Sequence, residues 1–142
     1  MAANPTELES VLEAWSASIR RKDIDALMAL YSPSIVYFDV VPPLHIEGLD
    51  AVRRNFVRWF DMWNGPIGVE IREMRLCEGG ELAAAHMLHR TSGRLKVGHE
   101  VDYWLRATVH CEKLASGWRI SHEHVSLPID FAHGTAVMDL QP

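Results

Sequence analysis

The spacing of apolar residues changes once along this chain, and that change constrains the fold more than any other feature. Up to about residue 63, apolar residues recur every three or four positions, which is typical of amphipathic helices. From about Gly68 to Val125 they mostly alternate, which is typical of strands. Helices followed by consecutive strands predict an α+β fold with helices on one face of an antiparallel sheet, rather than parallel βαβ units.

Three helices are predicted in the first half, over residues 5–21, 24–31 and 49–63. Asn4-Pro5 supplies a capping residue followed by a proline at the first helical position. Asp23 can cap the second helix, and Ser32-Pro33 ends it because the residue before proline avoids the helical region. The three predicted helices therefore precede most of the sheet.

Five strands are predicted, over residues 35–41, 68–77, 81–91, 99–113 and 118–125. The apolar positions change parity between Ile71 and Met74, which indicates a bulge that bends the strand. A curved sheet with helices against its concave face gives a cone-shaped fold, and the cone encloses a cavity suited to a ligand. No linker or repeat interrupts residues 1–142, so we expect one domain, and the tail 128–142 has no readable pattern.

Composition narrows the function classes. The net charge of −5 argues against a nucleic-acid partner, because phosphate contacts need clustered Lys and Arg. No apolar run reaches a membrane span and no signal peptide is visible, so we expect a cytoplasmic protein with no membrane partner. No glycine-rich phosphate loop occurs, so no nucleotide or flavin cofactor is expected. Cys77 and Cys111 lie in predicted strands and are expected to be buried, reduced thiols.

Three segments, in this order and at this separation, resemble a known superfamily. They are Asp23–Asp39, Ile46–Val52 and Gly117–Pro128. The chain resembles the nuclear-transport-factor-2-like proteins, and within them the SnoaL-like and ketosteroid-isomerase-like branches. The resemblance implies the cone-shaped α+β fold; it does not imply one activity, because isomerases, cyclases, dehydratases and proteins without known chemistry share this fold.

The resemblance also implies candidate catalytic positions. In the steroid-isomerase branch the general base is an aspartate at the end of the first strand, and Asp39 occupies that position. The tyrosine and the protonated acid that form the oxyanion hole in that branch are replaced by Trp15 and Val109. Steroid isomerisation is therefore put in doubt, whereas other acid–base chemistry is not.

Asp39 ends an apolar strand. If its carboxylate faces the cavity, desolvation should raise its pKa and make it a better base. The alternative is a structural aspartate that makes a turn or capping bond before Pro42-Pro43. The sequence leaves both interpretations open.

His122 and His124 alternate with Arg119, Ser121 and Glu123 near the end of the predicted last strand. His122 and His124 occupy the same side of the strand as Trp118 and Ile120, so they are expected to point inward, while Glu123 faces water. There they could serve as an acid or as a partner that orients Asp39. The alternatives are two satisfied core histidines, or a metal chelate with His86 or Asp39 as third ligand. No further ligand spacing supports the chelate, so no metal is expected.

Aromatic side chains are candidates for the wall of the pocket, with a filled core as the alternative. The expected ligand-binding set is Trp15, Tyr37, Trp59, Trp63, His86 and Tyr103.

The outer face of the longest predicted strand carries Trp104 and Arg106 among short polar residues. That mixture resembles the core of a protein interface, so we expect a homodimer through this face.

The predicted function is that of a pocket protein for a small, largely apolar carbonyl or hydroxyl compound. If it is an enzyme, it shuttles a proton between Asp39 and His122 or His124, as an isomerase, dehydratase or cyclase would. The alternative is a non-catalytic ligand-sensing or association domain. Convergence of Asp39 and a histidine on an open cavity favours the enzyme, and a filled core favours the domain.

Overall fold

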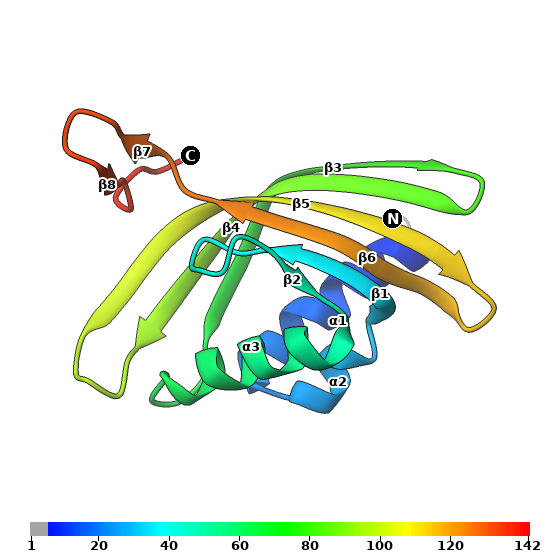
Figure 1. The fold of residues 1–142 in the computed structure, drawn as a ribbon, viewed down its shortest axis with the longest axis horizontal. Helices are drawn as coiled ribbons and strands as arrows, with labels where there is room; N and C mark the ends of the chain where they lie inside the picture. The colour runs from blue at the N-terminus through cyan, green and yellow to red at the C-terminus, as the bar shows by residue number, and fades with distance from the viewer. Residues whose placement is uncertain (1–5) are drawn as a thin grey trace, which may run out of the picture.

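Three helices lie against the concave face of a curved six-stranded sheet (Figure 1). The computed structural model describes residues 6–142. The elements in chain order are α1 Glu7–Arg21, α2 Ile24–Met28, β1 Tyr31–Phe38, β2 Ile46–Glu47, α3 Leu49–Asp61, β3 Gly68–Gly79, β4 Leu82–Arg94, β5 Glu100–Leu114, β6 Gly117–Ser126, β7 Ile129–Asp130 and β8 Thr135–Ala136. The α+β cone expected from the sequence is confirmed.

The order of strands in the main sheet is β2-β1-β6-β5-β4-β3. Neighbouring strands run antiparallel except β1 and β6, which run parallel, so the sheet is mixed near one edge. β3, β4, β5 and β6 follow one another by hairpins, and β1 joins the free side of β6. The end of β1 therefore lies beside the end of β6, with Phe38 opposite His124.

Two of the register shifts in the sheet, those in β3 and β6, decide which side chains face the helices. The register of β3 against β4 shifts between Arg72 and Arg75, which confirms the bulge predicted between Ile71 and Met74. A second shift occurs where β5 meets β6: His110 pairs with His122, but Cys111 pairs with Ile120, so Ser121 is left without a partner. An extra residue of this kind reverses the alternation of side chains beyond it.

The helix ends follow capping chemistry. Thr6 caps α1: its side chain accepts a hydrogen bond from the Glu9 backbone, and the Glu9 carboxylate accepts one from the Thr6 backbone. The expected cap at Asn4-Pro5 lies outside the described residues. Asp23 caps α2 through the Ala26 backbone, as predicted. α2 ends three residues before its expected limit, because the chain enters β1 at Tyr31.

The core fills the space between the sheet and the helices. Trp63 is 1% exposed and meets Trp59 edge-on, with ring centroids 5.7 Å apart. Phe56 of α3 contacts Tyr31 and Tyr37 of β1, which ties the third helix to the edge of the sheet. Cys111 belongs to this core, whereas Cys77 is exposed, so the expectation of a buried thiol was wrong for Cys77. Near the end of β3 the bulge has turned the strand out of the core.

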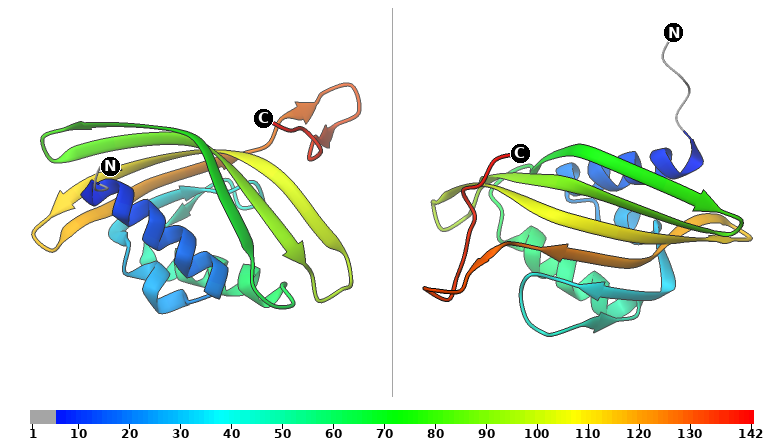
Figure 2. Two further views of the ribbon diagram at one scale, coloured as in Figure 1. Left: turned by 180° about the vertical axis from the view of Figure 1, so that it is seen from behind. Right: turned by 90° about the horizontal axis from the view of Figure 1, so that it is seen from above.

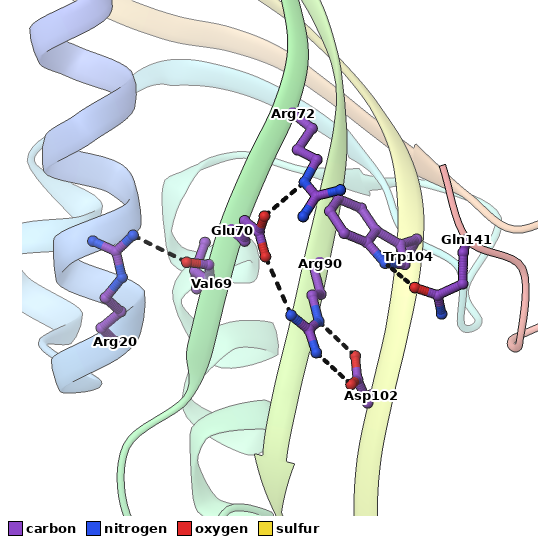
Figure 3. Close-up of polar contacts among 8 residues, drawn as sticks. All are labelled: Arg20, Val69, Glu70, Arg72, Arg90, Asp102, Trp104 and Gln141. Carbon is purple, nitrogen blue, oxygen red and sulfur yellow. Dashed lines mark hydrogen bonds and ion pairs between the residues drawn. The ribbon is translucent and has the colours of Figure 1, made fainter.

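The tail after β6 forms the small β7–β8 hairpin and then returns over the convex face of the sheet (Figure 2). There the Trp104 indole donates a hydrogen bond to the Gln141 side chain, 3.3 Å away, and the Arg72 guanidinium lies 5.1 Å from the indole ring (Figure 3). Trp104 is consequently only 9% exposed. No helix among residues 6–142 is long and apolar enough to cross a membrane.

Candidate functional site

A line of hydrogen bonds leads from α1 to a buried carboxyl group on β6. The indole nitrogen of Trp15 donates to the Tyr31 hydroxyl, 2.9 Å away, and this hydroxyl donates to Oε1 of Glu123, also 2.9 Å away. Glu123 is 2% exposed. Its other oxygen, Oε2, is buried without a hydrogen-bond partner among the described residues. A buried carboxyl group with one unpartnered oxygen is costly unless a proton or a ligand satisfies it.

The bulge at Ser121 places Glu123 in the interior. Trp118 and Ile120 face the helices before the bulge, and Glu123 and Val125 face them after it. The expectation that His122 and His124 point inward while Glu123 faces water was therefore wrong. His122 is half-buried and His124 is exposed.

Electrostatics single out Glu123. Burial raises the pKa of its carboxyl group to about 7; the hydrogen bond from Tyr31 opposes this rise, and the negative charge of Asp39 adds to it. Near neutral pH the group therefore exists in both protonation states. Burial, reinforced by the charge of Glu123, raises the pKa of Tyr31 and of Tyr37 well above the usual value, so both phenols stay protonated.

A small cavity adjoins Glu123. Its wall includes Trp15 of α1, Met87 and His89 of β4 and Val109 of β5. The volume is about 20 Å³, which is enough for roughly one water molecule. The wall is almost entirely apolar, so any hydrogen bond formed inside it is poorly screened by solvent.

His89 is the second buried polar group of this wall. It is 4% exposed, its Nε2 has no partner among the described residues, and burial lowers its pKa to about 4. Trp15 packs edge-on against the ring, with centroids 5.0 Å apart. His89 is therefore a neutral imidazole at neutral pH and can donate or accept one hydrogen bond towards a ligand.

Asp39 follows the last residue of β1 and is half-buried. Its Oδ2 accepts a hydrogen bond from the Asn55 side chain of α3, 2.9 Å away, and its Oδ1 accepts one from the Val40 backbone, 2.7 Å away. The Val40 bond is the local turn contact expected of a structural aspartate. The Asn55 bond and the effect of Asp39 on the pKa of Glu123 place it beside the buried cluster.

Asp39 and the two histidines do not form a hydrogen bond in the part of the chain that the structure describes. His122 instead bonds the Val36 carbonyl through Nδ1, at 2.7 Å, and both imidazoles pack edge-on against Phe38. The predicted catalytic partnership thus has no contact to support it, and a role for Asp39 stays a prediction.

The expected ligand-binding residues divide into three groups. Trp15 lines the cavity, and Tyr37 lies opposite Glu123 in the β1–β6 pairing. Trp59 and Trp63 belong to an aromatic cluster at α3, apart from the cavity wall. Tyr103 is partly buried on the concave side of β5, where burial raises its pKa.

His86 is exposed and was wrongly expected to line the pocket. On β4 the buried positions are Ala83, Ala85, Met87 and His89, so His86 points to the convex face. The metal interpretation that used it has no support either: among residues 6–142, no three His, Cys, Asp or Glu side chains are grouped closely enough to hold an ion.

Four polar residues of this region were not predicted to belong to the site: Tyr31, Asn55, His89 and Glu123. A signal for Glu123 does exist: the apolar positions of β6 are even before Ser121 and odd from Val125 onward, which is a change of parity like that in β3. Asn55 has a weaker signal, since it is a polar residue on α3 next to the buried Phe56.

Comparison with known proteins places this architecture. A family model described as the SnoaL-like domain matches residues 8–130. The chain belongs to the SnoaL-like family. It is also similar to the crystal structure of an NTF2-like protein from Pseudomonas putida KT2440, at 30% identity, with a TM-score of 0.87 over 96% of this chain and 94% of the other. No curated protein is similar enough to this SnoaL-like chain to count as a match.

Two more distant structures share the fold alone. A ketosteroid isomerase-like protein from Erwinia carotovora atroseptica SCRI1043 is 20% identical, with a TM-score of 0.71, covering 83% of this chain and 91% of that protein. A Xanthomonas campestris structure, named as a proposed calcium/calmodulin dependent protein kinase II association domain, is 17% identical, with a TM-score of 0.76 and 88% of each chain covered.

Proposed function

We propose that this SnoaL-like protein binds a small, largely apolar organic molecule next to Glu123 and transfers a proton at its carbonyl or hydroxyl group. The observation that carries the proposal is the state of Glu123: a fully buried carboxyl group with a pKa of about 7 and one oxygen without a partner, beside an apolar cavity. A group whose pKa lies near the working pH is best suited to exchange a proton with a substrate. Isomerisation, dehydration and cyclisation all need this step.

Each neighbouring polar residue has a proposed role in the proton transfer. Glu123 in its protonated form donates to a substrate oxygen, and Tyr31, held by Trp15, fixes the carboxyl group by its bond to Oε1. His89 supplies a second, neutral contact on the cavity wall. Asp39, oriented by Asn55, is the proposed base, in the position that the general base occupies in the isomerase branch. Pairs of titratable groups with different environments are typical of acid–base sites.

Binding requires the cavity to widen, since its present volume suits about one water molecule. Met87 and Ile71 lie in the wall, on β4 and on the bent part of β3. Methionine is unbranched and flexible, so Met87 can change rotamer with little loss of packing. The fold shared with the Erwinia protein, which is named ketosteroid isomerase-like, supports the proposal.

The small cavity also favours a second candidate function, that of an association domain. A nearly filled core was the outcome expected of such a domain, and the Xanthomonas relative carries that name. In this alternative Glu123 would be a structural group that exchanges no proton with a ligand. The two candidates differ in whether any small molecule is bound or altered.

The test is a screen of the full chain against a mixture of small cellular metabolites, with mass spectrometry of what is depleted or formed. Wild type is compared with Glu123→Gln, which keeps the shape of the side chain but cannot release a proton as an acid. His86→Ala is the matched control, because it removes an exposed imidazole from the convex face of β4.

The proposal expects a compound that wild type and His86→Ala convert and that Glu123→Gln does not. Conversion that survives in Glu123→Gln removes this residue from the mechanism. A protein that neither binds nor converts any compound, and that assembles into oligomers, supports the association domain instead.

A further inference from the structure

We propose that the convex face of the sheet carries a two-histidine site for a divalent transition-metal ion, formed by His110 of β5 and His122 of β6. This site lies on the face opposite the helices and does not depend on the proposed proton transfer. The two residues are direct partners in the antiparallel β5–β6 pairing, the last pair before the bulge at Ser121. Directly opposed residues in such a pairing point to the same face of the sheet.

The distance between the two rings suits joint binding of one ion. Their centroids lie 5.2 Å apart, with the ring planes tilted by 54°. Two imidazoles on one tetrahedral zinc ion, each with a zinc–nitrogen distance of about 2.0–2.1 Å, place their ring centroids roughly 5 Å apart. The observed spacing matches this value before any ion is bound.

The hydrogen bond at Nδ1 of His122 leaves Nε2 of the same ring free to bind a metal ion. Its Nδ1 lies 2.7 Å from the Val36 carbonyl oxygen, which can only accept a hydrogen bond, so Nδ1 carries the proton. Nε2 of the neutral ring then offers its lone pair. A metal-binding histidine usually donates its second N–H to a carbonyl or carboxylate in this way. Phe38 packs edge-on against the same ring, 4.8 Å between centroids, and limits its rotation.

Geometry limits the site to two protein ligands. The ring of His124 lies 6.4 Å from that of His122, which is too far for both to bind one tetrahedral ion as they stand. The described residues contain no ready group of three ligands. Water would fill the other positions, and His110 is exposed, so it can reach solvent. Imidazole ligands favour zinc, copper and nickel over magnesium or calcium.

The experiment is a titration of the full chain, stripped with chelator, with Zn²⁺ at pH 7.5, followed by calorimetry. Variants His110→Ala and His122→Ala each remove one imidazole, and His86→Ala removes an exposed imidazole of the same convex face as a matched control. Nitrogen-15 spectra of the histidine rings report which nitrogens change on binding, and these spectra need no variant.

We expect one Zn²⁺ per chain. Either single variant should weaken zinc binding by roughly tenfold or more, because losing a ligand should cost at least as much as losing a residue that orients one. The double variant should bind about as weakly as the single ones, because one remaining imidazole without its partner adds little affinity. His86→Ala should bind as wild type does, and the Nε2 signal of His122 should shift with added zinc. Equal binding by wild type and His110→Ala, or zinc-induced shifts confined to other histidines, would overturn the proposal.

Discussion

Replacing Glu123 by glutamine tests whether this residue holds a proton inside the fold. Its pKa is about 7 in the native protein, against an ordinary value of 4.5. Between these two pH values the native state keeps the proton while the unfolded state has lost it, so the contribution of Glu123 to the free energy of unfolding falls as the pH rises. At about 1.4 kcal/mol for each pH unit, Glu123 alone contributes a loss of about 3 kcal/mol over this interval.

The assay is urea unfolding of wild type and Glu123→Gln at several pH values from 4 to 8.5. Glutamine does not ionise, so the free-energy difference between the two proteins should change by about 3 kcal/mol over this range, in favour of the variant at high pH. Titrating groups that do not interact with Glu123 are present in both proteins and cancel in the difference. Glu81→Gln, at an exposed turn position, serves as control and should follow the wild type. A difference between wild type and Glu123→Gln that is constant with pH refutes the raised pKa and the reasoning built on it.

Four further outcomes are expected. Asp39→Asn should abolish turnover of a converted compound with little change in circular dichroism, because an amide keeps the shape but cannot act as a base; retained turnover would exclude Asp39. His89→Phe should remove a loss of stability on acidification: the pKa of His89 is about 4 when folded and 6.5 ordinarily, so this group alone lowers the unfolding free energy by up to about 3 kcal/mol between pH 6.5 and 4, opposite in sign to the contribution of Glu123. The free-energy difference between wild type and the variant should change by this amount, and a difference that is constant with pH would contradict this. Trp104→Glu should turn a homodimer into monomers in sedimentation at micromolar concentration, whereas a monomeric wild type would count against the proposed interface. EDTA should leave turnover unchanged, because the proposed acid and base lie on the concave side of the sheet, away from the histidine pair; an inhibited enzyme would contradict that separation.

The structure changes the expected exposure of Trp104 at the proposed dimer interface. Trp104 does not stand free on the convex face, because Arg72 and Gln141 cover it (Figure 3). Arg106 is exposed and bonds Ser126. Beside them Arg90 bridges Asp102 and Glu70, which gives this face a fixed pattern of charges. A second copy would therefore meet a preformed surface, and the tail would form part of the interface or move aside.

The fold could be predicted from the sequence because its signals are local. Each signal depends only on residues close together in the sequence: the helical period up to residue 63, the Asp23 cap and the parity change in β3. The structure confirms all three. The limits of the elements moved by a few residues: β1 begins at Tyr31 instead of Ile35, because its first part pairs with β6. Such pairing depends on residues about ninety positions away and leaves no local sign.

The site was less predictable from the sequence, because the bulge at Ser121 falls within a polar segment. Four polar residues in a row, from Ser121 to His124, give no apolar marker of the side that faces inward. Extending the parity of Ile120 across the bulge at Ser121 therefore places His122, Glu123 and His124 on the opposite face from the one they occupy. The Trp15–Tyr31–Glu123 line joins three separate elements, and its members become neighbours only in the fold.

The most direct test of the account is a nitrogen- and carbon-edited NMR titration of the Glu123 side-chain carboxyl carbon in the wild-type chain, assigned with Glu123→Gln. The account predicts a titration midpoint near pH 7, and a shift of this midpoint when a compound from the metabolite screen is bound. A carboxyl carbon that titrates near pH 4.5, the ordinary value for glutamate, would contradict the central claim that the fold holds a proton at Glu123 for exchange with a substrate.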